Sequence, residues 1–156
     1  MPNWLYIFVN GVYLVGAALW LGGGVVIIAG VNPSLFDSLT KHDATAASAS
    51  ILRRFARIQV VALLMMLIGA AVKFAVWERV ELVPWMAVRW TAIVLLAWAL
   101  VFELRHHRTL QALGSNLTPA LPADDPLRKV FDFLRIRAEG LMKASLIAAL
   151  IALLFS

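Results

Sequence analysis

The chain has 156 residues, of which 62% are hydrophobic and 15% are charged, with a mean hydropathy of +0.85 and a net charge of +5. Soluble domains are about half apolar and a quarter charged, so this composition predicts an integral membrane protein with one domain, residues 1–156. The basic balance predicts contact with anionic lipid headgroups rather than nucleic acid, and the lack of cysteine excludes disulfides, thiolate metal sites and cysteine nucleophiles.

The first predicted helix covers residues 4–31 and belongs to the longest apolar stretch of the chain. No charged side chain precedes Asp37, and a bilayer core requires only ~20 helical residues. We expect this helix to end at Asn32-Pro33, because the residue before a proline avoids the α conformation.

Small residues recur on neighbouring faces of this first helix, which contains six of the nine glycines. In lipid, small residues allow another helix backbone to approach closely. We therefore predict that the first helix is the central packing element of a bundle or contacts partner subunits. The alternative is that these glycines reflect only the ordinary composition of membrane helices. The predicted packing residues are Gly11, Ala18, Gly22, Gly23, Ala29 and Gly30.

Three more helices are predicted, at residues 58–77, 84–104 and 126–155, which gives an all-α integral membrane four-helix bundle. Residues 34–57 are expected to form a loop whose apolar side chains lie on the headgroup layer. Lys73 is expected to extend toward the interface at the end of the second helix.

The distribution of lysine and arginine predicts the orientation of the bundle. The first loop holds four of these residues and the stretch after the third helix holds six, against three on the opposite side. Basic loops remain in the cytoplasm. We therefore expect both termini on the non-cytoplasmic side of a bacterial inner membrane.

Three ionisable residues are predicted at membrane depth: Arg89, Glu139 and Lys143. The uncharged parts of their helices, residues 90–102 and 144–156, are only about 20 Å long at 1.5 Å per residue. Ionisable groups at this depth are costly and tend to mark function or a specific partner. Glu139 and Lys143 have the spacing of a helical salt bridge. The alternative is that these residues border a polar cavity.

The histidines His42, His106 and His107 are the remaining candidates for chemistry. Glu103 has the spacing to share a helix face with His106 or His107. We interpret this group as a basic, pH-sensitive cluster near anionic lipid. The alternative is a metal site formed by Glu103, His106 and His107 and completed by His42.

Several short motifs resemble those of a known family. They are Trp20-Leu-Gly-Gly, Pro33-Ser-Leu-Phe36, Arg53-Arg54-Phe55, Gly69 and Phe131-x-x-Leu134-Arg135. The pattern resembles an uncharacterised bacterial family of four-helix membrane proteins related to transmembrane protein 205, in which histidine often stands at the position of Arg135.

A more distant similarity is to CopD-type copper-resistance proteins and HemJ-type protoporphyrinogen oxidases, through Trp85-x-x-x-Arg89 and the four-helix plan. The resemblance to the oxidases implies a haem held by histidine from the membrane helices. The first predicted helix has no histidine, so the resemblance assigns haem to no residue and the cofactor stays unknown.

The leading hypothesis for function is a non-catalytic accessory or structural subunit of a larger membrane complex, bound to other membrane subunits or to copies of itself. The first alternative is a haem- or quinone-linked membrane oxidoreductase. The second is a transporter of small solutes or metal ions, suggested by the ionisable residues at membrane depth.

Overall fold

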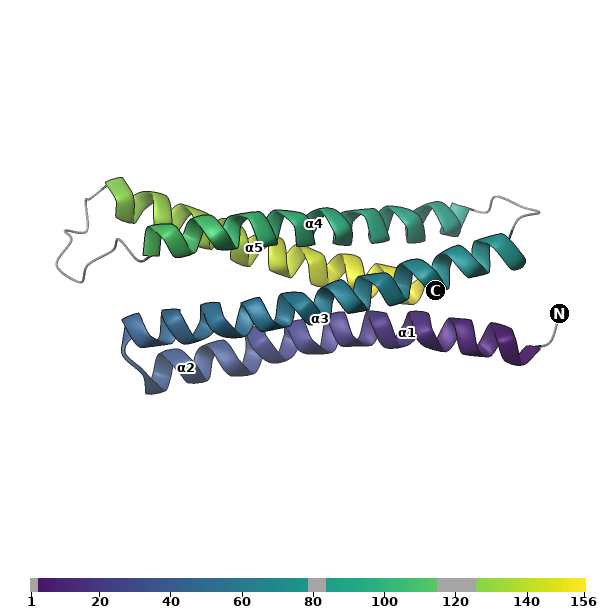
Figure 1. The fold of residues 1–156 in the computed structure, drawn as a ribbon, viewed down its shortest axis with the longest axis horizontal. Coiled ribbons are helices and arrows are strands. Elements are labelled where there is room, and N and C mark those ends of the chain that lie inside the picture. The colour runs from purple at the N-terminus through teal and green to yellow at the C-terminus, as the bar shows by residue number, and fades with distance from the viewer. Residues whose placement is uncertain (1–2, 79–83, 115–125) are drawn as a thin grey trace.

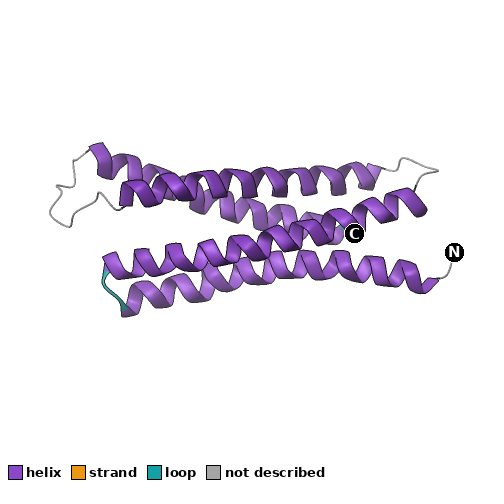
Figure 2. Cartoon of the chain, viewed as in Figure 1, coloured by secondary structure: helices purple, strands orange, loops and turns teal. Residues whose placement is uncertain are grey.

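The computed structural model describes residues 3–78, 84–114 and 126–156, and the regular structure in these ranges is entirely helical (Figure 2). The predicted all-α fold is therefore confirmed for the described residues. The elements in chain order are α1 (Asn3–Val25), the π-helical turn η1 (Val26–Val31), α2 (Asn32–Ser38), α3 (Lys41–Val76), α4 (Pro84–Gly114) and α5 (Pro126–Leu154).

The first three elements form one continuous helix from Asn3 to Ser38. The prediction that the first helix ends at Asn32-Pro33 is wrong, because the helix continues through the proline. A proline lacks an N–H group and crowds the carbonyl four residues earlier, which disfavours a regular α-helix. In η1 the spacing of the hydrogen bonds is wider, and the Asn32 N–H donates to the carbonyl of Ile27. This π-helical turn accommodates the proline without ending the helix.

The segment from residue 34 to residue 57 is also helical, so the predicted loop is wrong. Only residues 39–40 separate α2 from α3. The Thr40 hydroxyl caps α3 by accepting a hydrogen bond from the Asp43 N–H at 3.3 Å. The alanine-rich sequence that follows has high helix propensity, and it packs back on α2, where the Ser48 hydroxyl donates to Asn32 Oδ1 at 2.9 Å.

The helices form two antiparallel hairpins that lie against each other (Figure 1). α1 packs along α3, and α4 packs along α5; the hairpins then meet through contacts of α1 with α5 and of α3 with α4. The α2–α3 turn, the end of α4 and the start of α5 lie at one end of the bundle (Figure 1). We call this the basic end, and the end that carries the N-terminus the N-terminal end.

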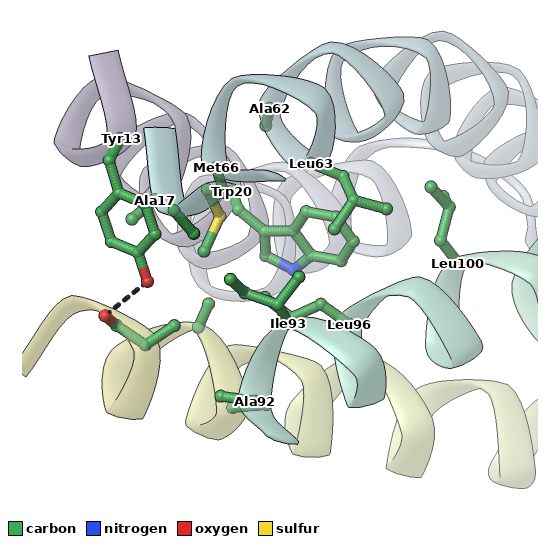
Figure 3. Packing of buried hydrophobic residues seen from close by; sticks show 14 residues of the cluster. Tyr13, Ala17, Trp20, Ala62, Leu63, Met66, Ala92, Ile93, Leu96 and Leu100 are labelled. Atoms are coloured by element: carbon green, nitrogen blue, oxygen red, sulfur yellow. Dashed lines mark hydrogen bonds between the residues drawn. The ribbon is translucent and has the colours of Figure 1, made fainter. Parts of the chain in front are cut away.

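The hydrophobic core lies where the hairpins meet, and Trp20 and Met66 are fully buried in it (Figure 3). Glycines allow α1 and α3 to approach closely beside this core. A Cβ atom on Gly16 would lie 2.7 Å from the carbonyl oxygen of Ala62, and one on Gly69 would lie 2.8 Å from Cβ of Tyr13. The close packing of α1 and α3 therefore depends on glycine at these two positions.

Large apolar side chains cover the outside of the bundle. Val94, Ile68 and Ile147, for example, are each about three-fifths exposed, and in water such a surface would be an aggregation or interaction site. Three helical stretches among the described residues are long and apolar enough to cross a membrane: Asn3–Ser38, Ser50–Val76 and Pro84–Arg105. Gly140–Leu154 in α5 is a shorter apolar stretch. The protein is a membrane protein.

Candidate functional site

A buried lysine lies between α1 and α3 near the N-terminal end of the bundle. Lys73 is completely inaccessible, so the expectation that its side chain extends to the interface is wrong. Its ammonium group donates a hydrogen bond to Oδ1 of Asn10. The same group lies 5.4 Å from the ring centroid of Tyr6 and 5.3 Å from that of Tyr13. The amide oxygen and the two aromatic faces therefore stabilise the charge inside the bundle.

Arg89 is the second buried cation, and it links α4 to the residues that follow α3. Its Nη1 donates to Oε1 of Glu78 at 2.9 Å, and its Nη2 donates to Oε2. This bidentate geometry is the strongest form of an arginine–carboxylate contact. The Nε atom of Arg89 is buried and has no hydrogen-bond partner among the described residues. We call Asn10, Lys73, Glu78 and Arg89 the charge cluster.

Two further hydrogen bonds join α1 to α5 next to the charge cluster. The Tyr13 hydroxyl donates to the carbonyl of Ala152 at 2.8 Å (Figure 3). Ala152 lies in the last turn of α5, where backbone carbonyls lack donors from their own helix. Deeper in the bundle, Nε1 of Trp20 donates to Oγ of Ser145 at 3.5 Å. Polar contacts from all the packed helices therefore hold the N-terminal end together.

A second buried polar contact lies nearer the basic end, between α3 and α4. Gln59 is 1% exposed, and its side-chain amide lies close to the carboxyl group of Glu103. The Oε1 atom of Gln59 has no partner. The structure therefore places Glu103 beside an amide of α3, a neighbour that neither the predicted pH-sensitive cluster nor the alternative metal site includes.

The polar residues of α3 and α4 follow a seven-residue spacing that is visible in the sequence. Gln59 and Lys73 are fourteen residues apart in α3, and Arg89 and Glu103 are fourteen residues apart in α4. Two turns of helix return to nearly the same face after seven residues, so both polar residues of each helix are able to face the interior of the bundle, where Lys73 meets α1 and Arg89 meets Glu78. Sequence reasoning identified Arg89 and Glu103 but missed Gln59, toward which this spacing from Lys73 and the apolar surroundings point, and it missed Glu78, to which the spacing does not extend.

The other predicted ionisable residues are distributed over three helices. His42 lies in the first turn of α3, His106 and His107 lie in α4, and Glu139 lies in α5, but their side chains are outside the described residues. Lys143 in α5 is exposed. Within the described part of the chain, no three metal-ligating side chains converge. The metal site and the Glu139–Lys143 bridge stay predictions.

The predicted packing face of the first helix is divided between the bundle and its surface. Gly23 faces the ring of Phe55 in α3, so that glycine packs within the bundle. A Cβ atom on Gly11, Gly22 or Gly30 would have nothing within 4 Å. These three glycines and the exposed Ala18 and Ala29 lie away from α3 and α5, which cover the opposite side of α1. Their assignment to an interface with a partner stays a prediction. We call Gly11, Ala18, Gly22, Ala29 and Gly30 the outer small face.

Comparison with known proteins gives a family match. The model of the DUF4149 family, described as a domain of unknown function, matches residues 15–117. The chain belongs to the DUF4149 family. No curated protein and no solved structure matches it.

The DUF4149 match extends from α1 through α4 and includes Lys73, Glu78 and Arg89 of the charge cluster, as well as Gln59 and Glu103. It is consistent with the uncharacterised membrane family expected from the sequence. The finer resemblances, to transmembrane protein 205 and to CopD- and HemJ-type proteins, stay predictions.

Proposed function

We propose that this DUF4149 protein is a non-catalytic accessory or structural subunit that packs, through the outer small face of α1, against another membrane subunit or a second copy of itself. Its whole length then acts as one transmembrane domain with α5 as the fourth span. It lies in a bacterial inner membrane with both termini on the non-cytoplasmic side.

The observation that carries this proposal is the unoccupied outer small face. Gly22, Ala18 and Ala29 are exposed, and Cβ atoms added to the glycines of this face meet no atom of the described residues within 4 Å. In a membrane, helices associate where small residues permit close backbone contact, because lipid supplies little hydrophobic drive for association. The other side of α1 already uses its glycines in this way against α3.

The charge distribution supports the proposed orientation. Arg53, Arg54 and Arg57 in α3 and Arg105 in α4 are exposed toward the basic end. At the N-terminal end, Lys73 and Arg89 are buried inside the bundle. Among the described residues, the exposed cations are therefore concentrated at the basic end more strongly than the count of lysine and arginine on each side indicates. By the positive-inside rule, this distribution favours a cytoplasmic location for the basic end.

Photo-crosslinking in intact membranes tests the proposed interface. A benzophenone amino acid in place of Leu19, an exposed residue of α1, lies next to the outer small face. We expect one protein adduct of defined mass, either twice the mass of the chain or the chain plus one other membrane protein. The added substitution Gly22→Leu is expected to reduce this adduct at least about tenfold, because a bulky side chain prevents close backbone approach.

The matched control places the same amino acid at Val94, on the exposed surface of α4. Equal protein adducts from both positions, or adducts to lipid alone from Leu19, would contradict the proposed interface. An adduct from Leu19 that Gly22→Leu leaves unchanged would also contradict it.

A further inference from the structure

The charge cluster has features of a binding site, which go beyond the role in assembly proposed above. We propose that Arg89 and Lys73 form a site for an anion of the carboxylate or phosphate class, and that Glu78 closes this site as a tethered carboxylate.

The first argument is the charge of the cluster. Lys73 and Arg89 are both buried, with exposed fractions of 0% and 1%, and the described residues provide one carboxylate to the pair, Glu78. A buried charge is costly unless it is paired. With Lys73 protonated, the described side chains of the cluster therefore carry an excess of one positive charge, which a bound anion would balance.

The second argument is the number of unused hydrogen-bond donors. Nε of Arg89 is buried without a partner, although a guanidinium has five N–H donors arranged to hold a planar carboxylate or a phosphate. The ammonium of Lys73 has three donors, and Asn10 Oδ1 is its described hydrogen-bond acceptor. The donors therefore exceed what Glu78 and Asn10 accept, as expected for a site whose ligand brings more oxygen atoms.

The third argument is access. The side chain of Glu78 is 18% exposed, whereas that of Arg89 is 2% exposed, so the carboxylate lies on the outer side of the guanidinium. Glu78 also follows the end of α3 and is not held within a helix. Rotation of this carboxylate away from Arg89 is the motion by which we expect the guanidinium to be exposed to an anion.

The surroundings place two sources of the anion within reach. Exposed aromatic side chains, among them Trp4, Tyr6 and Trp85, lie near the N-terminal end, and such residues mark the level of lipid headgroups. The anion is therefore a phospholipid phosphate at this interface or a free carboxylate or phosphate from the adjoining water.

Thermal unfolding in a phosphate-free maltoside detergent tests the site and separates the two sources. One arm adds inorganic phosphate or acetate, with sodium chloride at equal ionic strength as the reference, and the other adds phosphatidylglycerol. Saturating anion is expected to raise the melting temperature of the Glu78→Gln variant by about 5 °C. The wild type is expected to respond less, because Glu78 competes for Arg89.

Two variants make the result specific to the cluster. Arg89→Lys retains the positive charge but loses the bidentate geometry, and it is expected to lose most of the response. Arg54→Gln removes an exposed cation in the basic half of α3, and its response should equal that of the wild type. If Glu78→Gln does not fold, Glu78→Asp takes its place, because a shorter carboxylate reaches Arg89 less well.

Each outcome has a defined meaning. A response to phosphatidylglycerol alone identifies a lipid headgroup, and a response to phosphate or acetate identifies a free anion; either supports the site if Arg89→Lys reduces it. The absence of any response in both the wild type and the Glu78 variant would overturn the proposal. An equal response in Arg89→Lys would overturn it as well.

Discussion

Glycine has two distinct roles in α1, and a pair of single substitutions separates them. Gly16→Ala places a methyl group 2.7 Å from the Ala62 carbonyl oxygen, so α1 and α3 must move apart. We expect this change to lower the free energy of unfolding by about 1–3 kcal/mol, the usual cost of overpacking. Gly22→Ala meets no atom within 4 Å and is expected to be neutral or to stabilise the isolated protein by up to about 1 kcal/mol through helix propensity.

Unfolding of the purified protein in detergent micelles measures both changes against the wild type. Equal destabilisation by the two substitutions would show that the described packing of α1 on α3 does not distinguish these glycines.

The buried charges were only partly predictable at the level of single residues. The sequence places Arg89 within an apolar helix, and its location near membrane depth follows from the short uncharged run after it. The burial of Lys73 does not follow from that reasoning, because a lysine near a helix end is able either to extend outward or to turn inward. The direction of the Lys73 side chain depends on Asn10, Tyr6 and Tyr13 of α1, which the fold places around its ammonium group.

Among the elements, η1 is the feature that sequence rules describe least well. Pro33 and the residue before it predict the end of a helix, yet the chain stays helical by widening one turn. Local propensity did not predict this result because packing of α2 against α3, including the Ser48–Asn32 hydrogen bond, favours a continuous helix. The start of α5 at Pro126 was predictable because there the proline occupies the first helical position.

Replacement of the proline tests this explanation of η1. Pro33→Ala restores an N–H group and removes the ring, so the turn at Val26–Val31 is expected to relax toward a regular α-helix. Hydrogen–deuterium exchange should then slow about tenfold or more at the amides of residues 30–34, since a regular helix protects them better. Ser38→Ala, in the same helix and away from the π-helical turn, serves as the control. Unchanged exchange in Pro33→Ala would mean that the proline does not cause the wider turn.

For the whole molecule, the number of membrane crossings decides whether the two termini lie on the same side of the membrane. Three stretches satisfy the length and hydropathy expected of a span, while Gly140–Leu154 in α5 is shorter. The side-by-side packing of α5 with α1 and α4 favours a fourth crossing, because it buries Ser145 in the apolar part of α5. An even number of crossings places both termini on the same side of the membrane.

Cysteine labelling gives a direct reading of this topology, because the natural chain has no cysteine. A membrane-impermeant maleimide is expected to label Asn3→Cys and Ser156→Cys in intact spheroplasts. Ser38→Cys, at the basic end, should be labelled only after the membrane is permeabilised. If Asn3→Cys is labelled and Ser156→Cys is not, α5 does not cross the membrane. Labelling of Ser38→Cys in intact spheroplasts would show that the orientation is the reverse of the proposed one.

The central claim is that the outer small face of α1 is an interface in the membrane, and native mass spectrometry of the protein released directly from membranes tests it most directly. The proposed function predicts a complex with a second copy or with one other membrane subunit. Gly22→Leu should dissociate that complex, whereas Val94→Leu on the exposed face of α4 should leave it intact. A wild-type protein that is monomeric under these conditions, or a complex that Gly22→Leu does not affect, would contradict the account.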